Sequence, residues 1–398
     1  MIPVNTPLLA GNERKYLLEC LDSGWISSEG PFVQQFEERF ARSVSRRYGI
    51  AVSNGSAALD AAVAALDIGP GDEVILPSFT IISCAAAVVR AGATPVLVDC
   101  DPHSFNLLAN SVAARITPRT KAIMVVHLYG LPVDMAPLLA LARQHGLKVI
   151  EDAAEMHGQT CDDQPCGSFG DISTFSFYPN KHITTGEGGM LVVNDAALAQ
   201  RCRSLRNLCF KPEQRFVHDE LGWNLRMTNL QAALGLAQLE QIDGFVQRKR
   251  RMGQRYTRLL AGTPGLQLPL AASPQARNIY WVYPLVLDDA VPVDAKAVMA
   301  RLAQRGIGTR PFFWPMHEQP VLRKMGLFDG ERYPVAERIA RRGFYIPSGM
   351  ALTDAQIDAS AQALRGVMAE VMAEVMCDLP GAATPATTPR KATDALAV

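Results

Sequence analysis

A single lysine, Lys181, stands in a setting suited to a covalent cofactor. Residues 175–177, with a central serine, lie upstream, and a glycine-rich turn at residues 184–189 leads into an apolar strand downstream. A lysine amine attacks a carbonyl readily when desolvation or neighbouring charge lowers its pKa. We therefore predict that Lys181 is the reactive residue, although a lysine beside glycines is more often a solvated surface residue.

A carboxylate, Asp152, ends a second apolar run upstream of this lysine. In an open parallel sheet, ligands bind beyond the carboxyl ends of the strands, so an acid at a strand end faces the site. Pyridoxal phosphate needs both groups, because a lysine holds its aldehyde and a carboxylate keeps its ring nitrogen protonated. Alone, Asp152 reads as a helix cap or loop acid.

A phosphate-binding site is predicted near residue 54. Residues 50–52 indicate a short strand, Asn54 and Gly55 a turn, and the alanine-rich stretch that follows a helix. Small residues at a helix N-terminus let backbone N–H groups reach an anion that the helix dipole also favours. Ser56 and Ala57 are the expected contacts, and an ordinary N-cap is the alternative.

Together these residues resemble the sugar aminotransferases of the DegT/DnrJ/EryC1/StrS family, which have the aspartate aminotransferase fold (fold type I of the pyridoxal phosphate enzymes). The likeness covers nearly the whole chain. It includes residues 12–13, 24–28, 180–189, 222–229, 310–317 and 346–348. The resemblance implies a transaminase with pyridoxal 5'-phosphate as cofactor, a nucleotide-linked keto sugar as substrate and L-glutamate as amino donor. The segments favour GDP-4-keto-6-deoxymannose, aminated at C4.

The resemblance also implies roles for individual residues. Lys181 anchors the cofactor and then moves protons, Asp152 pairs with the pyridine nitrogen, and Glu155 lies near the phenolic oxygen. Asn224 reaches the phosphate of a neighbouring subunit, so a homodimer with shared active sites is expected. The phosphate contacts are Ser56, Ala57 and Ser176, and the weaker candidates for substrate contact are Arg226, Phe313 and His317.

One position departs from many members of that family. Ile81 stands where an aromatic residue often stacks on the pyridine ring. An aliphatic side chain supplies van der Waals contact without the stacking geometry of an aromatic pair. The sequence therefore leaves open how this face of the ring is covered.

Three alternatives accompany the main hypothesis. The first is amination of a UDP- or dTDP-linked keto sugar. The second is a pyridoxal phosphate-dependent sugar dehydratase, but relatives of that type carry histidine in place of the anchoring lysine, so Lys181 counts against it. The third is a non-catalytic sensor or scaffold, which no DNA-binding extension or strongly basic segment supports.

Charge composition argues against nucleic acid and membrane partners. The 398 residues include 39 basic and 39 acidic side chains, so the net charge is +0 and no general attraction to polyanions is expected. An anionic sugar nucleotide still needs a local basic patch. Arg226, Arg310 and Lys211 are the candidates for its diphosphate.

Eight cysteines without a C-x-x-C pair indicate reduced thiols and no metal site. The N-terminal residues lack a basic segment followed by a long apolar run, so we expect no signal peptide. No run reaches the roughly 18 apolar residues of a spanning helix. A cytoplasmic protein is the expectation.

Apolar runs of strand length alternate with helical patterns, which predicts an α/β fold with a mostly parallel sheet covered on both faces. We predict a large cofactor-binding domain (1–245), a smaller α+β C-terminal domain (246–376) and a disordered tail (377–398). A long helix is expected over 230–260. The predicted strands are 50–52, 73–76, 94–98, 122–126, 148–151, 172–177, 190–193 and 280–287. The predicted helices outside 230–260 are 32–47, 56–66, 82–91, 135–145, 196–205, 294–305 and 354–372.

Three histidines follow or flank these elements, namely His127, His157 and His182. His127 ends a predicted strand on the side where the cofactor is expected. A hydrogen-bonded structural histidine is about as common in such a place as one that touches a ligand. The same holds for the other two.

Overall fold

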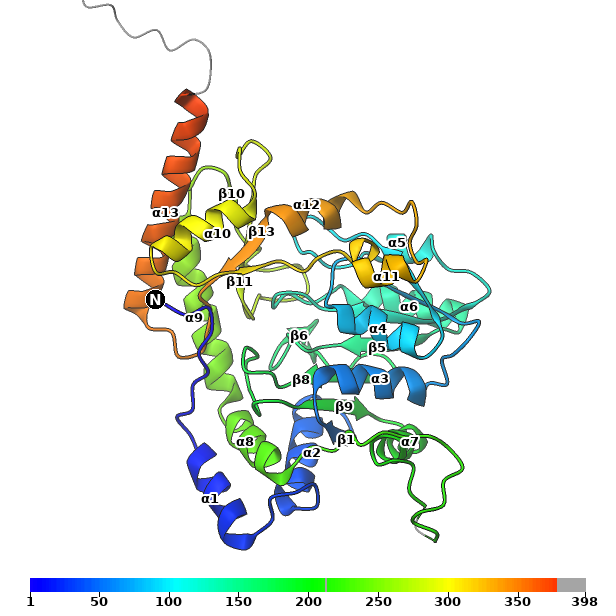
Figure 1. Cartoon of the computed structure of the whole chain (residues 1–398). Helices are drawn as coiled ribbons and strands as arrows, with labels where there is room; N and C mark the ends of the chain where they lie inside the picture. The colour runs from blue at the N-terminus through cyan, green and yellow to red at the C-terminus, as the bar shows by residue number, and fades with distance from the viewer. Residues whose placement is uncertain (212, 378–398) are drawn as a thin grey trace, which may run out of the picture.

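The computed structural model of the chain describes residues 1–211 and 213–377. The predicted tail therefore lies outside the described residues from position 378 on. Two sheets organise the chain, and α9 (Ile242–Leu260) runs from the region of the larger sheet to the smaller one (Figure 1). The division into domains at residue 246 stays a prediction.

The larger sheet has seven strands in the order β1-β9-β8-β5-β4-β2-β3. Strands β8, β5, β4, β2 and β3 are parallel to one another, whereas β9 pairs antiparallel with both β8 and β1. This confirms the mostly parallel α/β prediction. The strands are β1 (Tyr48–Val52), β2 (Glu73–Pro77), β3 (Thr94–Val98), β4 (Thr120–Val126), β5 (Lys148–Asp152), β8 (Ile172–Ser176) and β9 (Gly189–Val193).

Helices cover both faces of this sheet, because its strands are apolar on both sides (Figure 1). One face packs against α3 (Gly55–Ala65), α4 (Ile82–Arg90) and α7 (Ala196–Arg206). The other packs against α2 (Pro31–Ser43), α6 (Met135–His145) and α8 (Asn229–Leu239). The parallel strands therefore end together at one open edge between the two helical layers.

The smaller sheet lies in the C-terminal part of the chain and is antiparallel throughout, in the order β10-β11-β13-β12. Its strands are β10 (Leu266–Gln267), β11 (Tyr283–Leu287), β12 (Arg310–Pro311) and β13 (Gly343–Ile346). The predicted strand from residue 280 begins only at Tyr283. Tyr280 has a left-handed backbone (φ 51), which a strand does not accommodate.

The remaining elements are shorter or peripheral, apart from α13. They are α1 (Glu13–Ser23), α5 (Ala109–Ala113), β6 (Thr160–Cys161), β7 (Gln164–Pro165), α10 (Ala295–Gln304), the 3₁₀ turn η1 (Met316–Glu318), α11 (Pro320–Lys324), α12 (Pro334–Arg342) and α13 (Asp354–Cys377). Within the described ranges, no helix has both the length and the apolar character needed to cross a bilayer.

The N-terminal residues pair with the C-terminal part of the chain. The Ile2 N–H donates to the carbonyl of Gly306 at 2.7 Å, and the Ser348 N–H donates to the carbonyl of Val4 at 2.9 Å. The Asn5 side chain donates from Nδ2 to the carbonyl of Pro179 at 2.8 Å. This segment therefore links the C-terminal part to the stretch just before Lys181.

The prediction of one long helix over residues 230–260 is wrong. Two helices, α8 and α9, are separated at Glu240 and Gln241, which are neither glycine nor proline. The Glu240 carboxylate accepts from Asn12 Nδ2 and from the Tyr16 hydroxyl, both at 2.8 Å, so contacts with the N-terminal region hold the junction. Gly235 lies inside α8 because a Cβ there would come within 2.7 Å of the Phe36 ring.

Candidate active site

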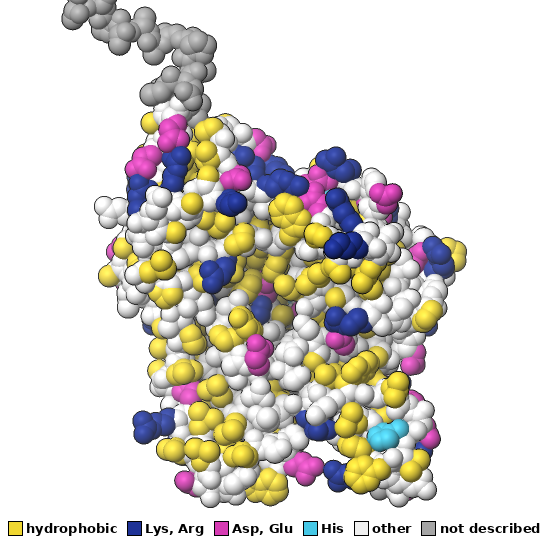
Figure 2. Space-filling view, in the orientation of Figure 1, with side chains coloured by type: hydrophobic (Ala, Val, Ile, Leu, Met, Phe, Trp, Pro, Cys, Tyr) yellow, Lys and Arg dark blue, Asp and Glu magenta, His cyan; other side chains and the backbone are white. Residues whose placement is uncertain are grey.

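A cavity of about 610 Å³ opens at the carboxyl ends of β4, β5 and β8. The strand-end residues His127, Asp152 and Ser176 line it from the large sheet. Trp281, Phe313 and Tyr345 line it from the C-terminal part of the chain. The face of the molecule in Figure 2 is hollowed near its middle, where hydrophobic side chains gather. The cavity thus lies where an open α/β sheet is expected to bind a ligand.

The Lys181 amine lies buried inside this cavity. Its Nζ atom is 3.8 Å from Glu155 Oε1 and 3.9 Å from the centre of the Trp281 ring. Burial lowers the pKa of Lys181, while Glu155 and Asp152 oppose that shift. A buried amine with a lowered pKa is a better nucleophile at neutral pH than a solvated one.

Asp152 ends β5 and points its carboxylate at the same space. Oδ1 accepts the N–H of Ala154 at 3.1 Å, and the Cys84 thiol donates to Oδ2 at 3.4 Å. Burial raises the pKa of Asp152, whereas the Ala154 and Cys84 hydrogen bonds and the charge of Lys181 lower it. A cationic ring nitrogen beside this carboxylate would compensate for the burial.

Glu155 completes the charged group around the lysine. Its Oε2 atom accepts the N–H of Tyr129 at 2.6 Å. Burial raises the pKa of Glu155 to about 8, and Lys181 only partly offsets the effect. Burial and the charge of Lys181 therefore act on the pKa of this carboxyl group in opposite directions.

Three serine hydroxyls gather where α3 begins. Ser56 Oγ and Ser83 Oγ are 2.7 Å apart, and Ser176 approaches so closely that a Cβ on Gly55 would lie 2.7 Å from its Cβ. Gly55 and Ser56, the first residues of this 11-residue helix, line the same space, and their N–H groups have no partners within the helix. Such a cradle is suited to a phosphate.

Ala57 differs from its predicted role. Its N–H donates to the Asn54 side chain at 2.8 Å, so Asn54 caps the helix. The Ala57 N–H is therefore not free to bind a phosphate. Ser56 and Ser176 line the cavity, and their contact with a phosphate stays a prediction.

The sequence model of the DegT/DnrJ/EryC1/StrS aminotransferase family matches residues 7–365 of the chain. The chain belongs to this family. The GDP-perosamine synthase of Caulobacter vibrioides is 46% identical over 363 residues, which are 91% of this chain and 97% of the relative. That of Escherichia coli O157:H7 is 41% identical, over 89% of this chain and 95% of the relative.

A solved structure agrees with this assignment. The aminotransferase TlmJ from Streptoalloteichus hindustanus superposes with a TM-score of 0.86 at 31% identity, covering 94% of this chain and all of that one. The family assignment, the fold prediction and the prediction of a sugar-nucleotide transaminase dependent on pyridoxal phosphate are therefore confirmed.

The residues around the cavity fit this cofactor independently of the family assignment. A hydroxyl cradle lies at a helix start, a buried carboxylate lies at the end of β5, and a buried amine lies between them and Trp281. Thr174 also lines the cavity, and its Oγ1 atom is buried without a hydrogen-bond partner among the described residues. The Ile81 side chain is 42% exposed and lines the cavity, so an aliphatic surface is present at the position that departs from many relatives.

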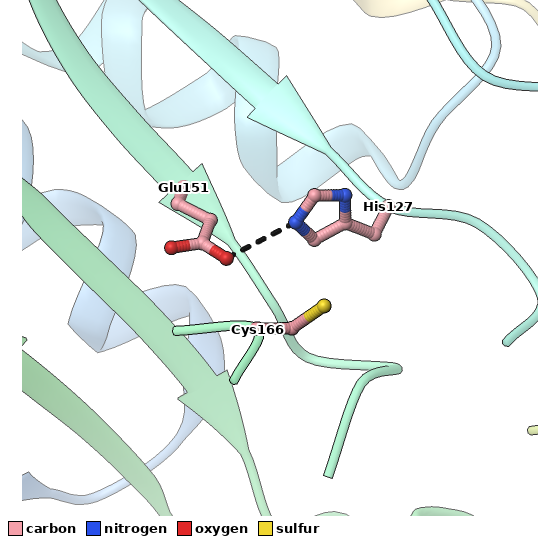
Figure 3. Close-up of side chains that lie close together, drawn as sticks. All are labelled: His127, Glu151 and Cys166. Carbon is pink, nitrogen blue, oxygen red and sulfur yellow. Dashed lines mark hydrogen bonds and ion pairs between the residues drawn. The ribbon is translucent and has the colours of Figure 1, made fainter. Parts of the chain in front are cut away.

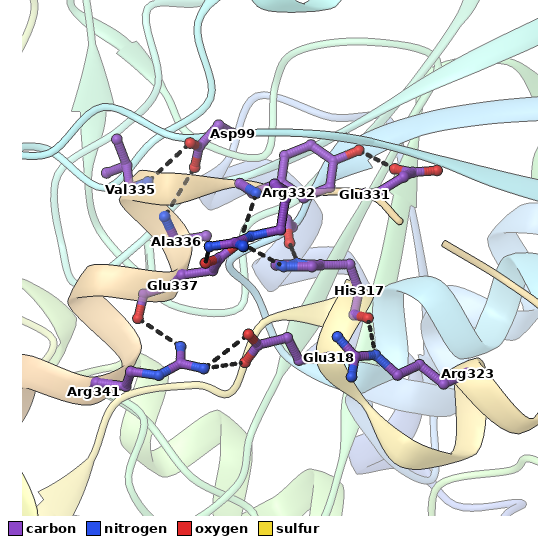
Figure 4. A network of polar contacts seen from close by, with 12 residues as sticks. Asp99, His317, Glu318, Arg323, Glu331, Arg332, Val335, Ala336, Glu337 and Arg341 are labelled. Atoms are coloured by element: carbon purple, nitrogen blue, oxygen red, sulfur yellow. Dashed lines mark hydrogen bonds and ion pairs between the residues drawn. The ribbon is translucent and has the colours of Figure 1, made fainter. Parts of the chain in front are cut away.

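His317 does not reach the cavity, contrary to its predicted contact with substrate. It is buried, Ser78 Oγ lies 2.9 Å from Nδ1, and Glu337 Oε1 lies 3.2 Å from Nε2 (Figure 4). Arg332, followed by other hydrogen bonds, lowers the pKa of Glu337 to about 2. Both ring nitrogens are occupied, so His317 joins η1 to α12 as a structural residue.

Asn224 and Arg226 also lie outside the cavity of their own chain. Asn224 is exposed and its backbone bridges to Asn207, whose side chain accepts from Arg226 Nη1 at 2.6 Å. Arg226 lines a separate pocket of about 210 Å³. The predicted role of Asn224 requires a second subunit and stays a prediction.

His127 is held by two hydrogen bonds, which favours the structural interpretation. Nδ1 accepts the N–H of Val133 at 3.0 Å, so Nε2 carries the proton that it donates to Glu151 at 3.1 Å (Figure 3). Glu151 also accepts from Gly167 N–H and from Ser173 Oγ. The thiol of Cys166 lies nearby, but a metal ion there would have to displace these donors.

His157 is buried among aromatic rings, and within the part of the chain that the structure describes neither ring nitrogen has a hydrogen-bond partner. Burial, followed by the charge of Lys181, lowers its pKa to about 3. Burial also lowers the pKa of His182, whose Nε2 lies 3.4 Å from the carbonyl of Ile279. Both are therefore neutral in the folded protein at neutral pH.

The pKa of His157 predicts a pH dependence of stability. Because the unfolded chain binds a proton below about pH 6.5 and the folded chain only near pH 3, stability is lost as pH falls through that window. His157→Leu should make this loss shallower, by up to about 1.4 kcal/mol per pH unit. Urea unfolding of the cofactor-free protein between pH 4 and 7 gives the free energy of unfolding at each pH and hence this slope. The exposed His103→Leu is the control, and an unchanged slope in His157→Leu would contradict the assignment.

Two cavity residues, Trp281 and Tyr345, were not predicted, and neither was Cys84, which contacts Asp152. Trp281 and Tyr345 lie far from Lys181 in the chain and carry no motif of their own, so only the folded arrangement brings them there. Cys84 lies in the first turn of α4, and nothing in the sequence indicated that its thiol donates to Asp152, because it is one cysteine in an apolar run.

Proposed function

We propose that the protein aminates C4 of GDP-4-keto-6-deoxymannose to give GDP-perosamine, with L-glutamate as amino donor. The observation that carries the proposal is the buried Lys181 amine between Glu155, Asp152 and Trp281. The relative from Caulobacter vibrioides, named a GDP-perosamine synthase and 46% identical over nearly its full length, supports the choice of sugar. A cytoplasmic location stays a prediction.

The residues divide the chemical work. Pyridoxal phosphate, when bound, supplies an electron sink that lets an amino group pass from donor to acceptor. Asp152 would hold the proton on its ring nitrogen, and Ser56, Ser83 and Ser176 would hold its phosphate. In the first half-reaction, Lys181 Nζ takes a proton from the α-carbon of glutamate. In the second half-reaction, it delivers one to C4 of the sugar.

The three candidates for the diphosphate differ in their surroundings. Lys211 pairs with Asp219, and Arg226 lies in the separate pocket. Arg310 is exposed and lines a cavity of about 200 Å³ that shares Tyr178, Asn180, Trp281 and Tyr345 with the larger one. It lies opposite Tyr345 in the β12–β13 register. We therefore assign Arg310 to the anionic part of the sugar nucleotide.

Arg310→Gln should raise the KM for the keto-sugar nucleotide about ten- to a hundredfold, because one charge-assisted hydrogen bond is lost. The half-reaction with glutamate should change little. Stopped-flow measurement of the two half-reactions separates these effects. Arg338→Gln, which removes a half-buried arginine paired with Asp289 outside the cavity, is the control. A change confined to the glutamate half-reaction would reassign Arg310 to the amino donor.

The homodimer with shared sites is part of the proposal. Asn224 is exposed and would contribute to the phosphate site of a second subunit. Mixing Lys181→Ala with Asn224→Ala should restore about a quarter of the activity, because half of the dimers then carry one intact site. No recovery after subunit exchange, or a fully active monomer in sedimentation, would contradict the shared site.

A panel of sugar nucleotides tests the substrate. The enzyme is first converted to its aminated form with glutamate and then offered 4-keto and 3-keto sugars linked to GDP, UDP and dTDP. GDP-4-keto-6-deoxymannose should restore the starting absorbance spectrum fastest and give a product of matching mass. Faster recovery with a UDP- or dTDP-linked sugar would overturn the assignment, and ammonia release without an amino sugar would indicate a dehydratase.

A further inference from the structure

A second buried lysine, Lys249, lies outside the cavity and has no role in the proposed chemistry. It belongs to α9 and is 2% exposed. Its Nζ atom donates to the carbonyl of Trp281 at 2.7 Å and also to the carbonyl of Ser348. Burial alone lowers its pKa to about 7, and these partners are carbonyl groups and not carboxylates. Burying an amine without a carboxylate partner costs free energy, which indicates that Lys249 has a role at this position.

The segment that Lys249 holds is strained and closely packed. Tyr280, immediately before Trp281, has a left-handed backbone (φ 51), which a bulky residue adopts only where its surroundings enforce it. A Cβ on Gly253 would lie 2.4 Å from the Tyr280 ring, and one on Gly130 would lie 2.5 Å from the Tyr280 nitrogen. Two glycines therefore make room for this turn, and Lys249 fixes the carbonyl that follows it.

Trp281 is fixed at its other end as well. Its indole Nε1–H donates to the carbonyl of Asn180 at 2.8 Å, the residue next to Lys181. Between the two anchors, the ring lies with its centre 3.9 Å from Lys181 Nζ. This places an aromatic face over the amine and excludes water from that side.

We propose that Lys249 is a positioning residue that holds Trp281 over the Lys181 amine and thereby sets how readily that amine gives up its proton. The inference rests on the proposed function only in taking Lys181 as the reactive residue. Two effects of the ring oppose each other, because the π face favours the ammonium form and the exclusion of water disfavours it. Burial is the first cause of the lowered pKa of Lys181, and Trp281 supplies part of that burial. Loosening Trp281 should therefore raise the pKa of the amine.

The test measures the pKa of Lys181 in cofactor-free protein, by competitive acylation across pH 6 to 11 and mass spectrometry of the peptide. Lys249→Met should raise this pKa by about one unit. The same change should have little further effect in a Trp281→Leu background, because the two residues act through one contact. Equal shifts in both backgrounds, or no shift with Trp281 present, would overturn the proposal.

Arg248→Met is the matched control. Arg248 is the neighbour of Lys249 on α9, and its guanidinium donates to the carbonyls of Met350 and Leu352 at 2.6 and 3.0 Å. It joins the same helix to the same C-terminal stretch without touching Trp281. This variant should lose stability and leave the pKa of Lys181 unchanged, and a shift equal to that of Lys249→Met would refute the specific link.

Trp281→Leu alone keeps the proposal testable if Lys249→Met does not fold. It should raise the pKa of Lys181, and an unchanged value would overturn the role of the ring. Neither sugar nor cofactor enters these measurements. Turnover measurements therefore test the proposed reaction. The pKa of Lys181 in the single and double variants tests this inference, so the two can fail separately.

Discussion

Lys181→Ala should reduce turnover with glutamate and the keto-sugar nucleotide to less than about one ten-thousandth of the wild-type rate. The variant loses the buried amine that holds the cofactor and moves the proton, and the other groups near this position, Glu155 and Asp152, are carboxylates. Product formation followed by mass spectrometry measures the effect. Substantial residual turnover would refute the role.

Two observations accompany this prediction. Lys148→Ala removes an exposed lysine paired with Asp171 and should leave turnover unchanged. Borohydride treatment of the cofactor-loaded wild-type protein should leave a pyridoxyl label on the peptide that contains Lys181. A label on a different lysine would move the reactive position.

Asp152→Asn should slow turnover at least about a hundredfold while the fold is kept. The amide retains the shape of the carboxylate and can accept the Ala154 N–H, but it has no charge to hold a proton on a ring nitrogen. Single-turnover rates of proton transfer, measured with α-deuterated and unlabelled glutamate, locate the loss. Asp171→Asn, in the exposed pair with Lys148, is the control. Near-normal rates would mean that the ring nitrogen has another partner.

Site residues that lie at the end of a strand or the start of a helix, next to a recognisable sequence pattern, could be predicted. Asp152 ends an apolar run, and parallel topology brings that end beside Ser176 and the start of α3. Lys181 follows β8 in the same way. Local patterns were sufficient here because the carboxyl ends of parallel strands always meet at one edge.

The parts that depend on distant segments were not predictable. Trp281 reaches Lys181 through a left-handed turn at Tyr280, and nothing in the residue types at 278–281 announces that backbone. The break between α8 and α9 occurs at good helix formers, because Asn12 and Tyr16 hold Glu240 from outside the helix. His317 looked like part of a substrate loop until burial placed it between Ser78 and Glu337.

The pairing of the N-terminal segment has a consequence for biosynthesis. Ile2 and Val4 are translated before the larger sheet, yet their partners, Gly306 and Ser348, are translated after it. Asn5, in the same segment, holds the carbonyl of Pro179 just before Lys181. A nascent chain therefore completes the larger sheet early but cannot secure its reactive loop until synthesis has passed residue 348, so that loop matures late.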